Sequence, residues 1–491
     1  MDAGSTDRPL GRPFEVTHRM VFAIAMPMTL AFITTPLLGL VDTGVVGQFG
    51  DARLIGGLAV GAAVFDVIFA TFNFQRTSTT GLVAQALGRG DEVEIQAIFW
   101  RAIALGLAAG AVLAALSPLV IRVGIAFMSP GPAVGEAARL YLGIRILSAP
   151  FALANYAILG FVLGQGRSFL GLLLQLLLNG VNIVASIGLG LGLGWGIAGV
   201  AWGTAIAETL ACAAGLAIVL PGFELAHRPG WRRVADGPAL LRLVLVNRDI
   251  MIRSFSLLAA FAFFTRQGAS FGTVTLAANA VLMNFFLVAG YFLDGLAAAA
   301  EQIVGRAVGA RNRAAFERGV RLTLLWGLVL AGLCTVFFLV AGNGLVAILA
   351  KDGSVRAEAA RFLPFAAATA LTGVLAFQMD GVFIGATWSR DMRNMMLLSL
   401  AAYLAALFAL GSLIGNTGLW IALNLFLGIR GITLSLALGR RSRQVFDPSS
   451  MALPAQARVS LSRNSAMEAA PTRASSALSP DRIRPGSDGP R

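Results

Sequence analysis

The sequence contains twelve apolar segments, each about as long as a helix that crosses a lipid bilayer. A spanning helix needs roughly 20 consecutive apolar residues, and it satisfies its own backbone hydrogen bonds inside the lipid. The segments are approximately 19–44, 53–76, 96–120, 138–162, 168–191, 196–220, 250–272, 275–299, 319–342, 360–384, 394–414 and 418–438. The chain is 57% hydrophobic and only 13% charged, whereas soluble domains carry about 25% charged residues. We therefore expect an all-α polytopic membrane protein.

Basic residues are concentrated in every second loop between these segments. The loops after the second, fourth, sixth, eighth and tenth segments contain, among others, Arg89, Arg167, Arg233, Arg311 and Arg390. Because cytoplasmic loops are enriched in Lys and Arg, we expect a multi-pass protein of the cell inner membrane with both termini cytoplasmic. The net charge of +13 follows largely from this bias, so we expect no nucleic-acid partner.

Short motifs in the first half recur in the second half at one constant offset. AQALGRGD (84–91) resembles GRAVGARN (305–312), and ILGFVLGQ (158–165) resembles MDGVFIGA (379–386), in both cases 221 residues apart. Two related halves in the same orientation form a parallel repeat about an axis along the membrane normal. The sequence therefore predicts two parallel six-helix repeats.

These patterns divide the chain into five parts. We expect a cytoplasmic N-terminal segment (1–18), an N-lobe (19–220), a cytoplasmic inter-lobe loop (221–249), a C-lobe (250–439) and a basic cytoplasmic tail (440–491). The tail is rich in Ser, Pro and Arg. Such a composition cannot bury enough apolar surface to fold, so we expect the tail to be disordered.

Asp42 is the one carboxylate in the first apolar segment, within the stretch PLLGLVDTGVVGQFG (36–50). An ionisable group at membrane depth is costly and usually marks a transport pathway, a proton relay or an ion site. Pro27 and Pro36 lie upstream, where each removes a backbone hydrogen bond and can kink the helix. We favour a proton-coupling site over the alternative, a helix-end acid wetted at the outer membrane surface.

Four other acids lie within the predicted spans. Asp66 and Glu208 are candidate cavity acids of the N-lobe, or structural acids paired with an amide or with Arg145; both interpretations stay open. Asp294 and Asp380 fall at a similar depth to Arg253 when rise is counted along their helices. We expect these three to form a structural ion cluster, with a second coupling or gating site as the alternative.

Other chemistries lack their characteristic motifs. Two cysteines and two histidines provide neither metal-ligand spacing nor a catalytic cluster, so we expect no metal site, no cofactor and no enzyme activity. There is no GxxxxGK[ST] loop to bind the phosphates of ATP. A pump driven by ATP is therefore disfavoured relative to a transporter driven by an ion gradient.

Six stretches carry a resemblance to a known family. They are PLLGLVDTGVVGQFG (36–50), QALGRGD (85–91), NRDIMIRS (247–254), LAANAVLMNFF (276–286), LDGLAAAAEQIVGRAVGA (293–310) and QMDGVFIGATWSRDMRN (378–394). In this order and spacing, over about residues 15–440, they resemble the multidrug and toxic compound extrusion (MATE) family and its DinF-like branch. The resemblance implies two lobes around a central cavity. It also implies export of organic, often cationic, compounds by alternating access, coupled to entry of H⁺ or Na⁺.

The resemblance also implies roles for particular residues. Proteins similar to the DinF-like branch protonate the acid of the first helix beside polar groups of the fifth, which here are Asp42, Asn179 and Asn182. The NorM-like branch carries a cation-binding acid on the seventh helix, where this chain offers Arg253 and Arg266 and no acid. We therefore favour H⁺ as the coupling ion, with Na⁺ as the alternative.

A flippase for a lipid-linked substrate, within the same superfamily, is a further alternative. It would favour a cavity lined by arginines that bind phosphate, whereas Asp42, Asp66 and Glu208 are acids. The expected partners are a small organic substrate and membrane lipids, and the protein is expected to function as a monomer.

Overall fold

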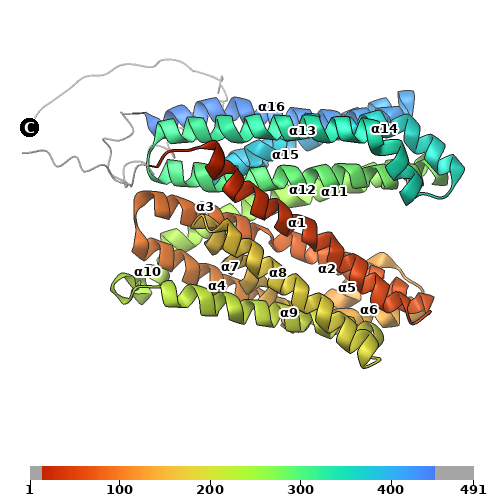
Figure 1. The fold of residues 1–491 in the computed structure, drawn as a ribbon, viewed down its shortest axis with the longest axis horizontal. Helices are drawn as coiled ribbons and strands as arrows, with labels where there is room; N and C mark the ends of the chain where they lie inside the picture. Colours follow the sequence, from red (N-terminus) through yellow and green to blue (C-terminus); the bar gives the residue numbers. More distant parts are fainter. Residues whose placement is uncertain (1–13, 448–491) are drawn as a thin grey trace, which may run out of the picture. The chain divides into compact units, whose positions relative to one another are not determined.

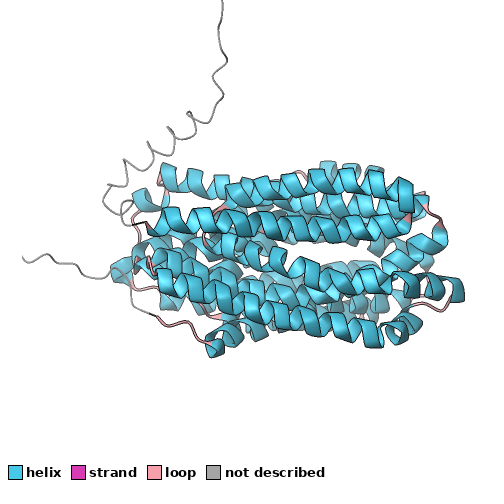
Figure 2. Cartoon of the chain, turned by 90° about the horizontal axis from the view of Figure 1, so that it is seen from above, coloured by secondary structure: helices cyan, strands magenta, loops and turns pink. Residues whose placement is uncertain are grey.

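The computed structural model describes residues 14–447, and those residues contain helices and no strand. The α-helices are α1 His18–Gly47, α2 Ala52–Phe72, α3 Phe74–Arg89, α4 Glu92–Ala115, α5 Ser117–Met128, α6 Pro132–Arg145, α7 Ala149–Gly164, α8 Ser168–Ala185, α9 Gly196–Val219, α10 Trp231–Val234, α11 Gly237–Ser270, α12 Thr273–Gly309, α13 Arg313–Leu349, α14 Gly353–Gly385, α15 Ser389–Ile414 and α16 Asn416–Phe446. The long helices run in a common direction in both views (Figures 1 and 2). The predicted all-α fold is confirmed.

The helices match the predicted spans, with differences at their ends. Within the described residues, eleven helical stretches are long and apolar enough to cross a membrane. The remaining predicted span lies in α11, which carries Arg253 and Arg266 along its length. α11 begins at Gly237, inside the predicted inter-lobe loop, because the Asp236 side chain accepts a hydrogen bond from the Ala239 amide and caps the helix.

The predicted terminal segments lie largely beyond the described part of the chain. The described residues up to Arg441 form one compact unit. α16 continues to Phe446, past residue 440, where the tail was predicted to begin. Residues 1–13 and 448–491 lie outside the described residues, so the expectations for them stay predictions.

The buried apolar side chains form separate cores in the two halves of the chain. The largest cluster draws on α11 to α16 and includes Phe264, Tyr403 and Trp420. Two others draw only on the first half, around Tyr141 and Phe161. Figure 1 shows the corresponding bundles, with α11 to α16 on one side and α2 to α9 on the other.

Close helix contacts recur in the two halves at the offset seen in the sequence. A Cβ atom on Gly160 would collide with the carbonyl oxygen of Arg76, and one on Gly381 would collide with the carbonyl oxygen of Ala297. Each residue of the second pair lies 221 positions after its counterpart in the first. Glycine therefore lets α7 approach α3, and α14 approach α12, in the same way. The predicted internal repeat is confirmed.

The two halves touch where α3 crosses α12. A Cβ on Gly88 would collide with the carbonyl oxygen of Arg306, and one on Gly309 with that of Gln85. The Gln85 Nε2 atom also donates to the carbonyl oxygen of Gly385 at 2.9 Å. Because these helix ends adjoin the loops predicted to be cytoplasmic, the halves are closed against each other on that side.

Helix α1 lies between the two halves. It packs against α8 of the first half and α12 of the second, and Figure 1 shows it running obliquely across both bundles. The side chain of Thr17 accepts a hydrogen bond from the Met20 amide and caps its start. The helix continues through Pro27 and Pro36 and so carries Asp42 toward its far end.

Candidate functional site

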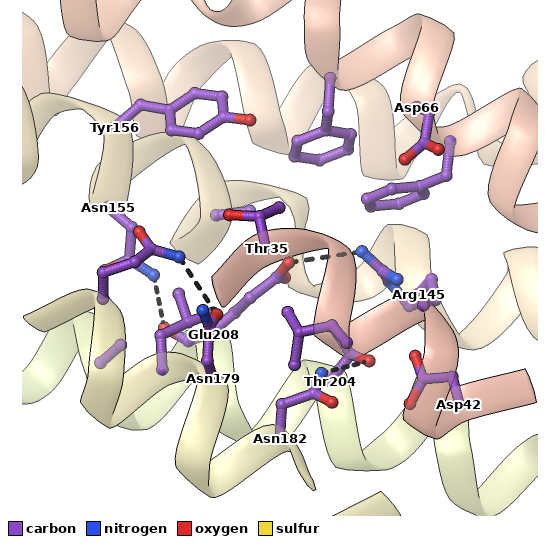
Figure 3. Close-up of a pocket in the computed structure, with 18 of the residues that line it drawn as sticks. Thr35, Asp42, Asp66, Arg145, Asn155, Tyr156, Asn179, Asn182, Thr204 and Glu208 are labelled. Carbon is purple, nitrogen blue, oxygen red and sulfur yellow. Dashed lines mark hydrogen bonds and ion pairs between the residues drawn. The ribbon is translucent and has the colours of Figure 1, made fainter. Parts of the chain in front are cut away.

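A cavity of about 450 Å³ lies among the helices of the first half. Its walls come from α1, α2, α6, α7, α8 and α9, with one side chain, Tyr291, from α12. The polar and charged side chains on the wall are Thr35, Asp42, Asp66, Tyr141, Arg145, Asn155, Tyr156, Gln175, Asn179, Asn182, Thr204, Glu208 and Tyr291. All five predicted N-lobe site residues therefore share one cavity, and Figure 3 shows how they surround it.

Asp42 is buried at the wall of this cavity, with 7% of its surface exposed. Its Oδ1 atom accepts a hydrogen bond from Ser186 Oγ at 3.0 Å. Ser186 Oγ also lies 3.4 Å from Asn182 Oδ1, and Asn182 Nδ2 donates to Thr204 Oγ1 at 2.8 Å. A serine hydroxyl has one hydrogen, so it donates either to Asp42 or to Asn182. Ser186 therefore connects the Asp42 carboxylate to the amide of Asn182. Asn182 is a site residue predicted from the sequence, whereas Ser186 was not predicted.

Ser186 directly follows α8, where the hydrogen-bonding pattern of the helix changes. The segment Ser186–Gly192, which follows α8, has π-helical hydrogen bonding. It packs tightly against α9, where a Cβ on Gly203 would collide with the Ser186 amide nitrogen. π-helical segments are rare, and many of them are found at functional sites.

Asn179 links α8 to α1 one turn away from Asn182. Its Nδ2 atom donates to Thr34 Oγ1 at 2.8 Å, and its Oδ1 atom accepts from Gln175 Nε2 at 3.1 Å. The amide therefore holds α8 against α1 close to Pro36, which also lines the cavity.

Glu208 and Arg145 form an ion pair across the cavity wall, drawn as a dashed line in Figure 3. Glu208 Oε1 lies 3.6 Å from Arg145 Nη2, and Ser148 Oγ donates to Glu208 Oε2. The guanidinium also donates to the Tyr141 hydroxyl at 2.8 Å and stacks 3.8 Å from the ring centroid of Phe65. Glu208 was predicted to be either a cavity acid or a structural acid paired with Arg145. In the structure it is both, since it lines the cavity and is paired with Arg145.

Asp66 is the exposed acid of the cavity. Within residues 14–447 it makes no ion pair within 4.0 Å and no side-chain hydrogen bond. When all groups are ionised, the three acids Asp42, Asp66 and Glu208 outnumber Arg145, and the wall has a net charge of about −2 from these four side chains.

The predicted charge cluster of the second half forms in part. Arg253 makes the expected ion pair with Asp380. Arg430, which was not predicted, pairs with the same carboxylate oxygen. Asp294 is half-buried, and no ion pair within 4.0 Å joins it to Arg253 or to any other described residue. A lone arginine in the last apolar segment was the sequence signal that could have identified Arg430.

A further pair of charges lies between the two halves. Arg76 Nη1 of α3 is 4.0 Å from Glu301 Oε2 of α12. Ser168 Oγ, on α8, donates to Gln302 Oε1 of α12 at 3.0 Å. These contacts add polar links to the glycine-mediated contact between α3 and α12.

Comparison with known proteins identifies what this arrangement resembles. The family model MatE matches residues 27–187 and 250–409. DNA damage-inducible protein F of Escherichia coli K12 is 37% identical over 426 residues, which covers 87% of this chain and 92% of that protein. The probable multidrug resistance protein NorM of Chromobacterium violaceum is 25% identical over 454 residues, covering 87% and 94%.

A solved structure supports the same fold. A multidrug resistance MATE family transporter of the MOP superfamily, in an outward-facing conformation, superposes with a TM-score of 0.77 at 16% identity. The match covers 87% of this chain and 96% of that one. The predicted fold of twelve spanning helices in two lobes is confirmed.

Proposed function

Because this chain belongs to the MATE family of membrane transporters, in its DinF-like branch, we propose that it is a secondary active exporter of small organic compounds. The observation that carries the proposal is the N-lobe cavity, which combines buried polar groups with apolar and aromatic walls. Relatives described as multidrug resistance and multidrug export proteins support the substrate class.

Coupling to H⁺ influx is the mechanism that the cavity favours. Asp42 is buried, yet among the described residues it has no cationic partner within 4.0 Å and one hydrogen-bond donor, the Ser186 hydroxyl. When Asp42 takes up a proton, the Ser186 hydroxyl is free to turn toward Asn182, since one hydroxyl serves both acceptors. Proton binding therefore rearranges the contact between α1 and the segment Ser186–Gly192 that follows α8.

Protonation of Asp42 also changes the charge that a substrate meets. A neutral Asp42 reduces the negative charge of the wall from about −2 to about −1, counted over Asp42, Asp66, Glu208 and Arg145. A bound organic cation then loses part of its attraction and is released. Proton and substrate thus compete for the same cavity, which is the requirement for antiport.

Na⁺ remains the second candidate for the coupling ion. Ser186 Oγ lies 3.0 Å from Asp42 Oδ1 and 3.4 Å from Asn182 Oδ1. Such oxygens are suitable ligands for a hard cation. In the second half, Asp380 is paired with both Arg253 and Arg430, which disfavours a cation site at this carboxylate. The flippase alternative is disfavoured because Arg145 is the one arginine on the cavity wall and it is paired with Glu208.

Transport in proteoliposomes tests the proposal. The purified protein is reconstituted, and accumulation of a fluorescent organic cation is followed under an imposed H⁺ gradient or an imposed Na⁺ gradient at equal pH. We expect uphill transport with the H⁺ gradient alone. Transport with the Na⁺ gradient alone would identify Na⁺ instead of H⁺ as the coupling ion. No uphill transport with either gradient would refute the proposal that the protein is a secondary active exporter.

A further inference from the structure

A second, smaller cavity of about 40 Å³ lies where α3, α4 and the start of α11 meet. Gln85, Arg89, Glu94, Arg101 and Arg242 line it. It is formed by the ends of the helices that adjoin the loops predicted to be cytoplasmic. In Figure 1, α10, which contacts α4, marks this end of the bundle, beside the end of α3.

The carboxylates near this cavity are already bound by arginines. Glu94 Oε1 accepts from Arg101 Nη1 at 2.6 Å, and Glu94 Oε2 accepts from Arg233 Nε at 2.8 Å. Asp91 Oδ2 lies 3.3 Å from Arg233 Nη2. Arg101 is only 4% exposed and also donates to the carbonyl oxygen of Val234. These two arginines and two acids balance each other in charge.

Two guanidiniums at the cavity therefore remain without an anion. Within residues 14–447, the side chains of Arg89 and Arg242 take part in no hydrogen bond and in no ion pair within 4.0 Å. Asp91 and Glu94 attract the Arg89 guanidinium, and Arg242 and Arg233 repel it more weakly. Both side chains belong to exposed residues, and they come from helices separated in sequence by the whole of α4 to α10. Two like charges held beside one cavity are stabilised by an anion that both can contact.

We propose that this cavity binds the phosphate group of an anionic phospholipid. Arginine forms charge-assisted, often bidentate hydrogen bonds to phosphate. The adjoining segment also presents exposed apolar side chains, with Trp231 80%, Leu241 59% and Val244 51% exposed. Tryptophan is enriched at membrane interfaces, and basic clusters beside a spanning helix attract anionic lipids of the cytoplasmic leaflet. The apolar side chains accommodate the acyl chains while the headgroup occupies the cavity.

A lipid in this position would act on the contact between the two halves. Gln85 lines the cavity and donates to Gly385 on α14 of the other half. Arg242 belongs to α11, which packs against α12 and α15. The headgroup therefore connects α3 to α11 in the arrangement in which the halves are closed at this end, and it stabilises that arrangement.

Lipid titration of the purified full chain in detergent tests the proposal. The melting temperature and the lipid adducts seen by native mass spectrometry are followed with phosphatidylglycerol, with phosphatidylcholine and with inorganic phosphate alone. The variants are Arg89→Gln, Arg242→Gln and the double variant. Arg232→Gln is the matched control, since it removes an exposed arginine of α10, just before α11, and Arg232 does not line the cavity.

We expect phosphatidylglycerol, and not phosphatidylcholine, to bind and to raise the melting temperature of the unsubstituted protein. Each cavity substitution should weaken apparent binding about tenfold, equivalent to about 1.4 kcal/mol, and Arg232→Gln should weaken it less than twofold. Equal binding by the double variant, or an equal loss in Arg232→Gln, would overturn the site. A saturable effect of inorganic phosphate without any effect of phosphatidylglycerol would overturn the lipid assignment.

Discussion

Replacing Asp42 by asparagine should abolish proton-driven transport while leaving the fold intact. The side-chain oxygen of Asn occupies the place of Asp42 Oδ1 and can still accept the hydrogen bond from Ser186, 3.0 Å away. The change exchanges a hydrogen bond to a charged group for a neutral one, which costs about 1 kcal/mol. It also removes a buried charge, which offsets part of that cost. The purified variant should therefore melt within a few degrees of the unsubstituted protein.

The expected size of the transport effect follows from the number of protons that the cavity exchanges. One pH unit across the membrane supplies about 1.4 kcal/mol for each proton, which sustains about a tenfold substrate gradient. If Asp42 alone carries the proton, one pH unit should sustain about a tenfold accumulation of a monovalent cation. Two coupled acids would sustain about a hundredfold accumulation. The Asp42→Asn variant should accumulate none.

The assay is steady-state accumulation of a fluorescent cation in proteoliposomes under a pH gradient of one unit, with the membrane potential clamped to zero. Asp66→Asn is the control, because Asp66 lines the same cavity but makes no side-chain hydrogen bond within the described residues. It should weaken substrate affinity and keep the tenfold gradient. Accumulation by Asp42→Asn equal to that of the unsubstituted protein would show that another acid carries the proton.

Three further predictions concern stability, closure and orientation. Asp380→Leu leaves the buried Arg430 and the partly buried Arg253 without their carboxylate and should lower the free energy of unfolding by about 3–5 kcal/mol. Arg253→Met keeps the Arg430 pair and should cost less than half as much, so equal losses in denaturant titrations would contradict this. Gly309→Leu places a side chain against the Gln85 carbonyl and should separate the halves, seen as a longer distance between spin labels on α4 and α13; an unchanged distance would show that the helices adjust locally. A cysteine replacing Arg311, in the otherwise cysteine-replaced chain, should react with an impermeant thiol reagent only from the cytoplasmic side, and reaction from outside would reverse the predicted orientation.

The fold could be predicted from the sequence because its main signals are local or periodic. Segment length and hydropathy identified the spanning helices, and the constant offset of 221 residues identified the repeat. The same offset reappears in the glycine contacts of α7 with α3 and of α14 with α12. Glycine has no side chain and is favoured where two helix backbones approach closely. The spacing of these glycines therefore makes the repeat detectable in the sequence.

The candidate site could be predicted only in part. Asp42 was selected because a carboxylate is conspicuous in an apolar segment, and Asn179 and Asn182 were selected through the family resemblance. The structure gathers all three at one cavity. Ser186 was missed, since a serine is unremarkable in a membrane helix and its link to Asp42 spans 144 residues. Arg145 was named only as one candidate partner of Glu208, and no pattern within its own segment indicated that pairing.

The sequence by itself determined which segments cross the membrane, that the two halves are related, and which acids lie at membrane depth. The tertiary structure alone decided that Arg430 joins Arg253 on Asp380, while Asp294 stays apart, and that the halves touch at the end of α3 and α12. Hydropathy is insensitive to the rotation of a helix about its own axis, and rotation decides whether a charged side chain faces a cavity, a partner or the lipid. That rotation is fixed by packing between helices far apart in the chain, which becomes defined only when the whole bundle has assembled.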